Sequence, residues 1–461
     1  MKLTLQEAEN MITCNEGNLD LSASEYTELP EDLHVFGSLD LHGSKITSLP
    51  VNLSVGGDID LRQSAITALP DPFRINGDLD LSGSRIASLP KHLHVGGDLD
   101  LSNTPITTLP EGLRVDGNLI LRRSQISVLP KGLRVGGNLD LSRTQISSLP
   151  EKLSVGGNLD LSKTPVTALP DDLFVDGDID LSNSKIVTLP WKFCVNGSLN
   201  LRNAPIRDLP MHLSVNRDLN LCNTFITELP EELDVGRDLN LSCTQIRKLP
   251  EKLSVGRNLN LSSTRIEELP RSLFPHGNLD LRNTPISYLP ENLCVGGDLN
   301  LNWTDIAVLP KGMCVGGSLY LDVSRIDVMP VNLSVSGNLD LSNAPCICLP
   351  EYLDVGGNLD LSHSQITSLP ENLSVGGDLC LDDSDIAELP EMLSVGGNLD
   401  LRKTKVTSLP EKLIVNGTLF LKIKLDAAAK DSATGWEINL QNKMITRLAF
   451  SFEAEEADVS Q

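Results

Sequence analysis

The feature that constrains this chain most is a strict 20-residue period. A Leu-Pro pair occurs at Leu29-Pro30 and then every 20 residues up to Leu409-Pro410, with Met329 replacing the leucine once. No insertion or deletion interrupts this spacing. Self-similarity at a fixed period of this size is the signature of a solenoid or a related repeat architecture. The sequence therefore predicts one long repeat domain, not the roughly three compact domains that 461 residues would otherwise suggest.

The pattern inside one repeat predicts a short strand followed by an extended return. Residues 91–110 read KHLHVGGDLDLSNTPITTLP, and Leu99 and Leu101 alternate with polar residues, as in a strand with one buried face. Pro110 fixes φ and favours an extended segment over a helix. Further positions are predicted to be buried after the chain turns, namely Leu93, Val95, Ile106 and Leu109. Only 3% of the chain is aromatic, so this core must be aliphatic.

A single coil of this kind buries too little apolar surface to fold alone, so neighbouring coils must stack. Stacking predicts a β-rich repeat solenoid of about 20 coils of 20 residues each. Parallel strands would form a sheet on one face, and extended or 3₁₀ return segments would form the other. The outward side chains of the sheet are then the positions most free to carry function.

Four columns of the repeat resemble the leucine-rich-repeat pattern LxxLxLxxNxLxxLP. Leu99, Leu101, Thr104 and Ile106 match its L, L, N and L columns, and the resemblance covers about residues 14–421. The 20-residue period with Leu-Pro is similar to the short bacterial subclass found in type III secreted effectors. The EspR-type group of enterohaemorrhagic Escherichia coli is the nearest likeness. Two columns depart from the pattern, because Ser or Thr replaces the usual Asn and Gly replaces the first leucine.

The two ends differ from the repeats and predict three parts of the chain. Residues 1–13 carry the Thr4-x-x-Glu7 pattern of a helix capping box and are expected to cover the first coil. The resemblance implies that this segment also serves as an uncleaved secretion signal. Residues 14–421 form the solenoid. Residues 422–461 break the period and are expected to form a C-terminal cap and an acidic tail.

Charge and hydropathy argue against two classes of partner. The 38 basic and 62 acidic residues give a net charge of −24, which opposes general binding to nucleic acid because phosphate contacts need Lys and Arg. No run of 18 apolar residues is present, so no membrane span is expected. No cofactor is predicted.

The sequence also predicts that the protein is not an enzyme. It has no phosphate-binding loop, no zinc-protease motif and no nucleophile elbow. Some effectors with this repeat carry a ubiquitin ligase domain with a nucleophilic cysteine, but about 40 residues follow the repeats here and they contain no cysteine. His92 and His94 lack a third ligand column, so no metal site is predicted. An enzyme with an unrecognised site is a minor alternative.

The outward face of the predicted sheet carries an acidic column with two interpretations. It holds Asp in most strands from Asp20 to Asp180 and then changes to Asn over residues 200–260. One interpretation is a solvated ladder that keeps the sheet soluble. The other is a docking face for a basic partner or a loose Ca²⁺ site.

The middle of the repeat contains the first candidates for protein binding. Over three consecutive coils an Arg replaces a Gly where the acidic column is neutral, at Arg217, Arg237, Arg257, Asn220, Asn240 and Asn260. Such a patch suits an acidic or phosphorylated partner, whereas duplication of one coil would copy the same changes without function. By strand parity the three arginines are expected to point partly inward.

Further along the chain, Trp303 and Tyr320 interrupt polar columns. Both residue types are common interface anchors, although a Trp after the strand would also cover a gap in the stack. Together these features predict a non-enzymatic protein–protein interaction scaffold. The resemblance implies a type III secreted virulence effector, whose partners are the secretion apparatus and a host protein bound along the sheet face. It would pass from the bacterial cytoplasm into the host cell. A bacterial scaffold or regulator that is never secreted is the main alternative.

Overall fold

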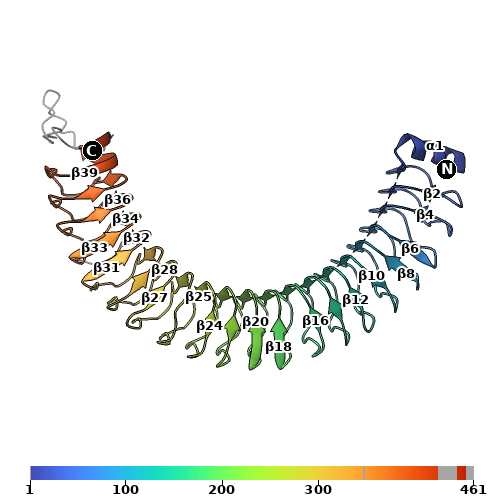
Figure 1. The fold of residues 1–461 in the computed structure, drawn as a ribbon, viewed down its shortest axis with the longest axis horizontal. Coiled ribbons are helices and arrows are strands. Elements are labelled where there is room, and N and C mark those ends of the chain that lie inside the picture. Colours follow the sequence, from blue (N-terminus) through green and yellow to red (C-terminus); the bar gives the residue numbers. More distant parts are fainter. Residues whose placement is uncertain (1, 346–347, 424–443, 453–461) are drawn as a thin grey trace, which may run out of the picture. The chain divides into compact units, whose positions relative to one another are not determined.

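The computed structural model describes residues 2–345, 348–423 and 444–452. It divides into two units, Met1–Arg237 and Asp238–Gln461, and each unit is described by itself. Both are built from the same 20-residue coil, and the short strands of successive coils lie side by side within each unit (Figure 1).

Most coils contribute two short strands separated by a bend, and the coil 271–290 has only the second of them. We number a coil from the residue after a Leu-Pro pair, so that in residues 91–110 the bend is at Gly97, which is position 7. Strands lie around positions 4–5 and 9–10, and they pair in parallel with the same positions of the next coil. For example, Leu99 pairs with Leu119, and Val95 pairs with Val115. A strict period therefore becomes a strict register.

The first unit begins with helix α1 (Leu5–Cys14). Its strands at positions 9–10 are β1 (Leu19–Asp20), β3 (Leu39–Asp40), β5 (Ile59–Asp60), β7 (Leu79–Asp80), β9 (Leu99–Asp100), β11 (Leu119–Ile120), β13 (Leu139–Asp140), β15 (Leu159–Asp160), β17 (Ile179–Asp180), β19 (Leu199–Asn200) and β21 (Leu219–Asn220). Its strands around positions 4–5 are β2 (His34–Val35), β4 (Ser54–Val55), β6 (Phe73–Ile75), β8 (Leu93–Val95), β10 (Arg114–Val115), β12 (Arg134–Val135), β14 (Ser154–Val155), β16 (Phe174–Val175), β18 (Lys192–Val195), β20 (His212–Val215) and β22 (Asp234–Val235).

The second unit repeats this arrangement. Its strands at positions 9–10 are β23 (Leu239–Asn240), β25 (Leu259–Asn260), β26 (Leu279–Asp280), β28 (Leu299–Asn300), β30 (Leu319–Tyr320), β32 (Leu339–Asp340), β34 (Leu359–Asp360), β36 (Leu379–Cys380) and β38 (Leu399–Asp400). Those around positions 4–5 are β24 (Ser254–Val255), β27 (Cys294–Val295), β29 (Cys314–Val315), β31 (Asn332–Val335), β33 (Tyr352–Val355), β35 (Ser374–Val375) and β37 (Ser394–Val395). Two longer strands, β39 (Ile414–Ile423) and β40 (Met444–Phe452), pair in parallel after the last repeat.

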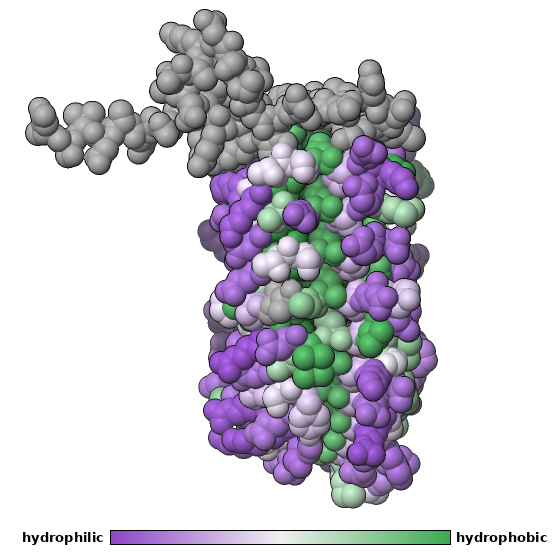
Figure 2. Space-filling view, turned by 90° about the vertical axis from the view of Figure 1, so that its left-hand side faces the viewer, coloured by the Kyte–Doolittle hydropathy of each residue, from purple (hydrophilic) through white to green (hydrophobic). Residues whose placement is uncertain are grey.

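The core is a set of aliphatic columns that run along the stack. In the coil 91–110 the predicted core residues are all buried, with 2% of Leu93, 7% of Leu109 and none of Leu99 exposed to solvent. The prediction of a parallel-strand solenoid of 20-residue coils is therefore confirmed. On the face of the second unit that Figure 2 presents, an apolar column runs along the stack between hydrophilic borders.

A buried Ser or Thr at position 14 replaces the asparagine of the usual repeat. The Thr104 hydroxyl donates a hydrogen bond to the carbonyl oxygen of Leu101 at 2.6 Å and so bonds the backbone of the turn. Ser44 and Ser84 differ, because their buried hydroxyls make no hydrogen bond to any described residue. The serine side chain is less restricted at χ1 than the β-branched threonine side chain. A serine hydroxyl at this position can therefore lie either with or without the hydrogen bond to the turn.

Helix α1 starts at the predicted capping box. The backbone N–H of Thr4 donates to the Glu7 carboxylate at 2.9 Å, and the backbone N–H of Glu7 donates to the Thr4 hydroxyl at 3.3 Å. Ala8 and Ile12 are buried on one side of the helix. The division into residues 1–13, 14–421 and 422–461 stays a prediction, and residues 424–443 and 453–461 of the C-terminal part lie outside the described residues.

Candidate protein-binding surface

The side chain at position 8 joins each coil to the next through a hydrogen bond to the backbone. The Asp78 carboxylate accepts the backbone N–H of Asp98 at 2.7 Å, and the Asp98 carboxylate accepts that of Asn118 at 2.7 Å. Asn, Asp or Ser occupies this column in most coils because each supplies an oxygen acceptor. The sequence pattern alone did not reveal this role. The signal that could have indicated it is that position 8 holds almost only short side chains with an oxygen acceptor.

This ladder explains the glycine at the bend. A Cβ placed on Gly97 would lie 2.1 Å from the Asp78 carboxylate oxygen and 2.8 Å from the backbone carbon of Gly77. The coils approach too closely at position 7 for any larger residue unless the stack opens. A glycine at position 7 therefore indicates that two successive coils approach each other closely.

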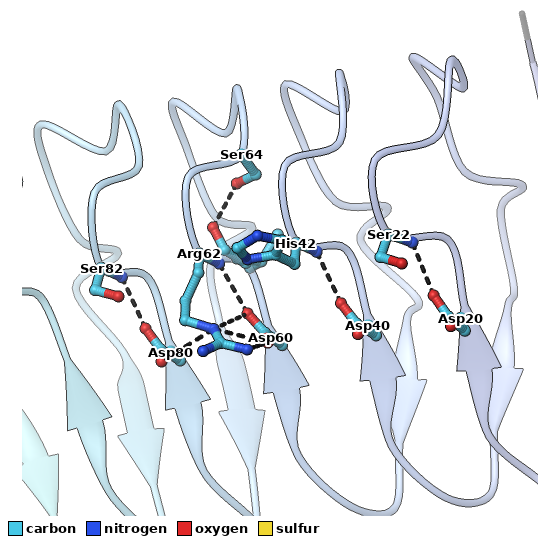
Figure 3. Close-up of polar contacts among 10 residues, drawn as sticks. Asp20, Ser22, Asp40, His42, Asp60, Arg62, Ser64, Asp80 and Ser82 are labelled. Atoms are coloured by element: carbon cyan, nitrogen blue, oxygen red, sulfur yellow. Dashed lines mark hydrogen bonds and ion pairs between the residues drawn. The ribbon is translucent and has the colours of Figure 1, made fainter.

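The acidic column at position 10 caps the turn that follows each strand. Figure 3 shows Asp20 and Asp40 each accepting the backbone N–H of the residue two places on, at 2.9 and 2.8 Å. The column is thus part of the coil's hydrogen bonding and not only a solvated ladder. The burial of Asp160 raises the pKa of its carboxyl, and the like charges of Asp140 and Asp180 raise it further. An ionised carboxylate in this column therefore opposes folding most strongly where the side chain is most buried.

The asparagines of the candidate set keep this cap without the charge. Asn220, Asn240 and Asn260 are half-buried, and each accepts the backbone N–H two residues on at 3.0, 3.0 and 2.9 Å. The change from Asp to Asn therefore alters the electrostatics of the face and leaves its backbone hydrogen bonding intact.

The three arginines of the candidate set are all exposed, so the expectation that they point partly inward is wrong. A side chain at the bend is directed at the preceding coil, so a long one has room only towards solvent. Arg217 and Arg237 lie in the first unit, and Arg257 lies in the second. The Arg217 guanidinium is 3.9 Å from the Asp178 carboxylate and 56% exposed. Its role in binding stays a prediction.

The aromatic candidates lie in the second unit. Trp303 is 63% exposed and occupies position 13, where the turn holds it in the left-handed region at φ 60°. Val323, the same position in the next coil, has φ 53°, an unusual conformation for a β-branched residue. Tyr320 is half-buried in β30 between Asn300 and Asp340 of the adjacent strands. Their role as anchors also stays a prediction.

No group of three or more His, Cys, Asp or Glu among the described residues is placed to hold a metal ion. His92 and His94 instead each contact one carboxylate, those of Asp71 and Asp116, both at 3.1 Å. In the described part of the chain, no helix has the length and apolarity needed to cross a membrane.

Comparison with known proteins identifies the fold. No protein-family model matches the sequence, and no curated protein does. A chain of the Drosophila Toll–Spätzle complex, in its glycosylated form, aligns with a TM-score of 0.53 and 16% identity over 92% of this chain and 80% of that chain. YopM from Yersinia enterocolitica aligns with a TM-score of 0.48 and 20% identity over 97% of this chain and 94% of that chain. YopM from Yersinia pestis, described as a leucine-rich effector protein, aligns with a TM-score of 0.41 and 20% identity over 68% and 91%. The chain has the leucine-rich-repeat fold.

Proposed function

We propose that the protein is a non-enzymatic scaffold that binds another protein along its exposed sheet face. The main observation behind this proposal is that some outward-facing residues differ from the repeat pattern although the turn-capping hydrogen bonds are kept. Asn220, Asn240 and Asn260 cap their turns as the aspartates do, so the fold does not require the change. Exposed Arg217, Arg237 and Arg257 offer cationic groups to an acidic or phosphorylated partner.

The aromatic pair supports the same function. Trp303 is the larger of the two anchors, and it is presented to solvent from a left-handed turn that a smaller residue would adopt at lower cost. Tyr320 replaces Asp or Asn in the capping column and supplies an amphipathic ring. The fold itself suits protein recognition, since a chain that shares it was solved in the Toll–Spätzle protein complex.

We further propose that the protein is a type III secreted effector with a host protein as its partner. This step rests on the 20-residue Leu-Pro pattern and its resemblance to the short repeats of bacterial effectors. The protein would reside in the bacterial cytoplasm before secretion and act inside the host cell afterwards.

Secretion is tested in bacteria with and without a working type III apparatus, with a cytoplasmic enzyme as the lysis control. Release that depends on the apparatus and is lost on deletion of residues 1–25 supports the effector. Retention in both strains contradicts it and favours a scaffold that acts inside the bacterium.

The binding face is tested with a partner identified by cross-linking in host cells and then purified. Reversal of charge at Arg217, Arg237 and Arg257 to Glu is expected to weaken binding by at least about 100-fold, as truncation of charged contacts often does. The matched control reverses three other exposed arginines, Arg122, Arg202 and Arg265. Equal affinity in both triple variants would contradict the proposed role of the bend arginines.

A further inference from the structure

A column of basic side chains crosses four adjacent strands of the first unit. Position 4 holds Arg74 in β6, His94 in β8, Arg114 in β10 and Arg134 in β12. The register pairs Arg74 with His94, His94 with Arg114, and Arg114 with Arg134. The next two strands continue the column with Ser154 and Phe174, so the run of basic residues ends there. We call these four residues the basic column.

The arginines of this column have no acidic partner. Arg74, Arg114 and Arg134 are exposed, and none of them forms an ion pair or a side-chain hydrogen bond with any residue that the structure describes. His94 alone is paired, with the Asp116 carboxylate at 3.1 Å. Arg62 of the first unit, by contrast, forms a charged hydrogen bond of 2.5 Å with Asp60.

The column borders an open groove with a volume of ≈ 640 Å³. Five basic side chains and a single acidic one line it, together with the backbone of Gly112 and apolar atoms: Arg74, Lys91, His92, His94, Arg114 and Glu111. Nothing lies within 4 Å of a Cβ placed on Gly112, so the groove is open above that residue. His92 is held by the Asp71 carboxylate at 3.1 Å.

Arg114 and Arg134 place like charges on directly opposed strand positions, and this opposes the fold. Two cations about 5 Å apart repel by about 0.8 kcal/mol even in bulk water, and like charges on directly opposed strand positions are destabilising. The repulsion arises in a chain whose net charge is −24, where acidic residues are the common surface type. An anionic ligand would relieve the repulsion and make charge-assisted hydrogen bonds with the free guanidinium groups.

We propose that the basic column binds an extended acidic segment of a partner protein. Three strand spacings of about 4.8 Å give the column a length of about 14 Å. Carboxylates at i, i+2 and i+4 of an extended peptide lie on one side and span about 13–14 Å, so a segment running along the stack places the outer two near Arg74 and Arg134 and the middle one between His94 and Arg114. The groove beside Arg74 and Arg114 would accept the backbone of that segment.

The surroundings favour a short peptide over a long polyanion. Nucleic acids and anionic membranes present charge well beyond 14 Å and would be repelled by the excess of acidic groups elsewhere on the chain. The proposal goes beyond the function proposed above, because it concerns a different face and does not depend on secretion or on Arg217.

The test measures binding of a fluorescent peptide with Glu at alternate positions to the full-length protein, by anisotropy in 150 mM salt. A peptide of the same composition with its glutamates in one block is the ligand control. We expect the triple variant Arg74→Gln, Arg114→Gln, Arg134→Gln to bind the alternating peptide at least about tenfold more weakly. The matched variant Arg85→Gln, Arg123→Gln, Arg143→Gln removes the same charge from other exposed positions and is expected to change affinity by less than about twofold.

Three results would overturn the proposal. The first is no binding by the unaltered protein. The second is equal loss of affinity in the two triple variants, or equal affinity for the alternating and block peptides, since either means only general electrostatics. The third is column-dependent binding of a single-stranded oligonucleotide or of phosphatidylserine vesicles that is tighter than binding of the peptide. Thermal unfolding of each variant, unchanged from the parent, shows that the column was removed without loss of the fold.

Discussion

In the first unit, a run of coils with glycine at the bend differs from the coil that has Arg217 there. From Gly97 to Gly177 the bend residue lies against the preceding coil, and the ladder bonds at position 8 measure 2.7–2.8 Å. In the coil of Arg217 the ladder bond from the Asp218 backbone to the Ser198 hydroxyl is 3.4 Å, and the bond from the Arg217 backbone to Gly197 is 3.3 Å. The ladder bonds of these glycine coils are therefore shorter than the ladder bond in the coil of Arg217.

The difference separates two functions of the same position. A glycine lets the ladder acceptor reach the next backbone, whereas the coil of Arg217 has a longer ladder bond and gains an exposed cation. The capping column changes one coil earlier, from Asp180 to Asn200, in a coil that keeps Gly197 at the bend.

The largest expected effect comes from adding a Cβ to a glycine coil. A Cβ on Gly137 would lie 2.5 Å from the Asn118 side-chain oxygen and 2.9 Å from the Gly117 backbone carbon. Gly137→Ala should therefore lower the free energy of unfolding by about 3 kcal/mol, as overpacking does. Arg217→Ala, which retains a Cβ already accommodated, should change it by less than about 0.5 kcal/mol. Urea denaturation measures both, and similar losses would mean that the two bends are equally tight.

Removal of the ladder acceptor should have an intermediate effect. Asp98 accepts the Asn118 backbone N–H at 2.7 Å and the Asn118 amide at 2.8 Å. Asp98→Ala should cost about 1.5 kcal/mol, the scale of hydrogen bonds to charged groups. Ser198→Ala, which removes the 3.4 Å bond of the arginine coil, should cost less than about 0.5 kcal/mol. Hydrogen exchange of the Asn118 and Asp218 amides would locate each effect, and equal protection loss at both would contradict the comparison.

The smallest effect concerns the charge of the capping column. The pKa of Asp160 is raised by burial, so the folded state binds its proton more tightly than the unfolded state does. The ionised Asp160 carboxylate therefore destabilises the folded state at pH 7. This destabilisation disappears as the pH falls below the pKa of the group in the unfolded state. Asp160→Asn should raise the free energy of unfolding by about 0.5 kcal/mol at pH 7 and not at pH 3.5.

Asp20 is the matched control for this pH dependence. The backbone N–H of Ser22 lowers the pKa of the Asp20 carboxyl, so its ionised form favours the folded state above the unfolded pKa. Asp20→Asn should therefore bring no gain in stability at pH 7. A gain in both variants, measured by chemical denaturation at the two pH values, would mean that removal of any acidic charge stabilises the chain.

Periodicity predicted the core and the strands because burial repeats with the sequence. Leu99 and Leu101 flank a polar residue, as their equivalents do in most copies, and a local pattern suffices to place them and Ile106. The ladder was not predicted because its bonds join residues that are 20 apart in the sequence. From the sequence alone, a ladder aspartate such as Asp78 cannot be told from an aspartate that only faces solvent. The orientation of Arg217 was predicted wrongly because strand parity does not hold at a bend. The basic column has one member per coil, and its pattern becomes visible only when position 4 is known to face outward.

The ladder also determines how such a gene can change in length. Each position-8 oxygen meets a backbone N–H 20 residues later, so a single inserted residue would displace every acceptor of its coil from its donor. Removal or duplication of a whole coil restores the pairing with the next one. Recombination between repeats is thus the form of length variation that this fold tolerates, and surface columns such as Arg74–Arg134 can be extended or shortened by one member at each event.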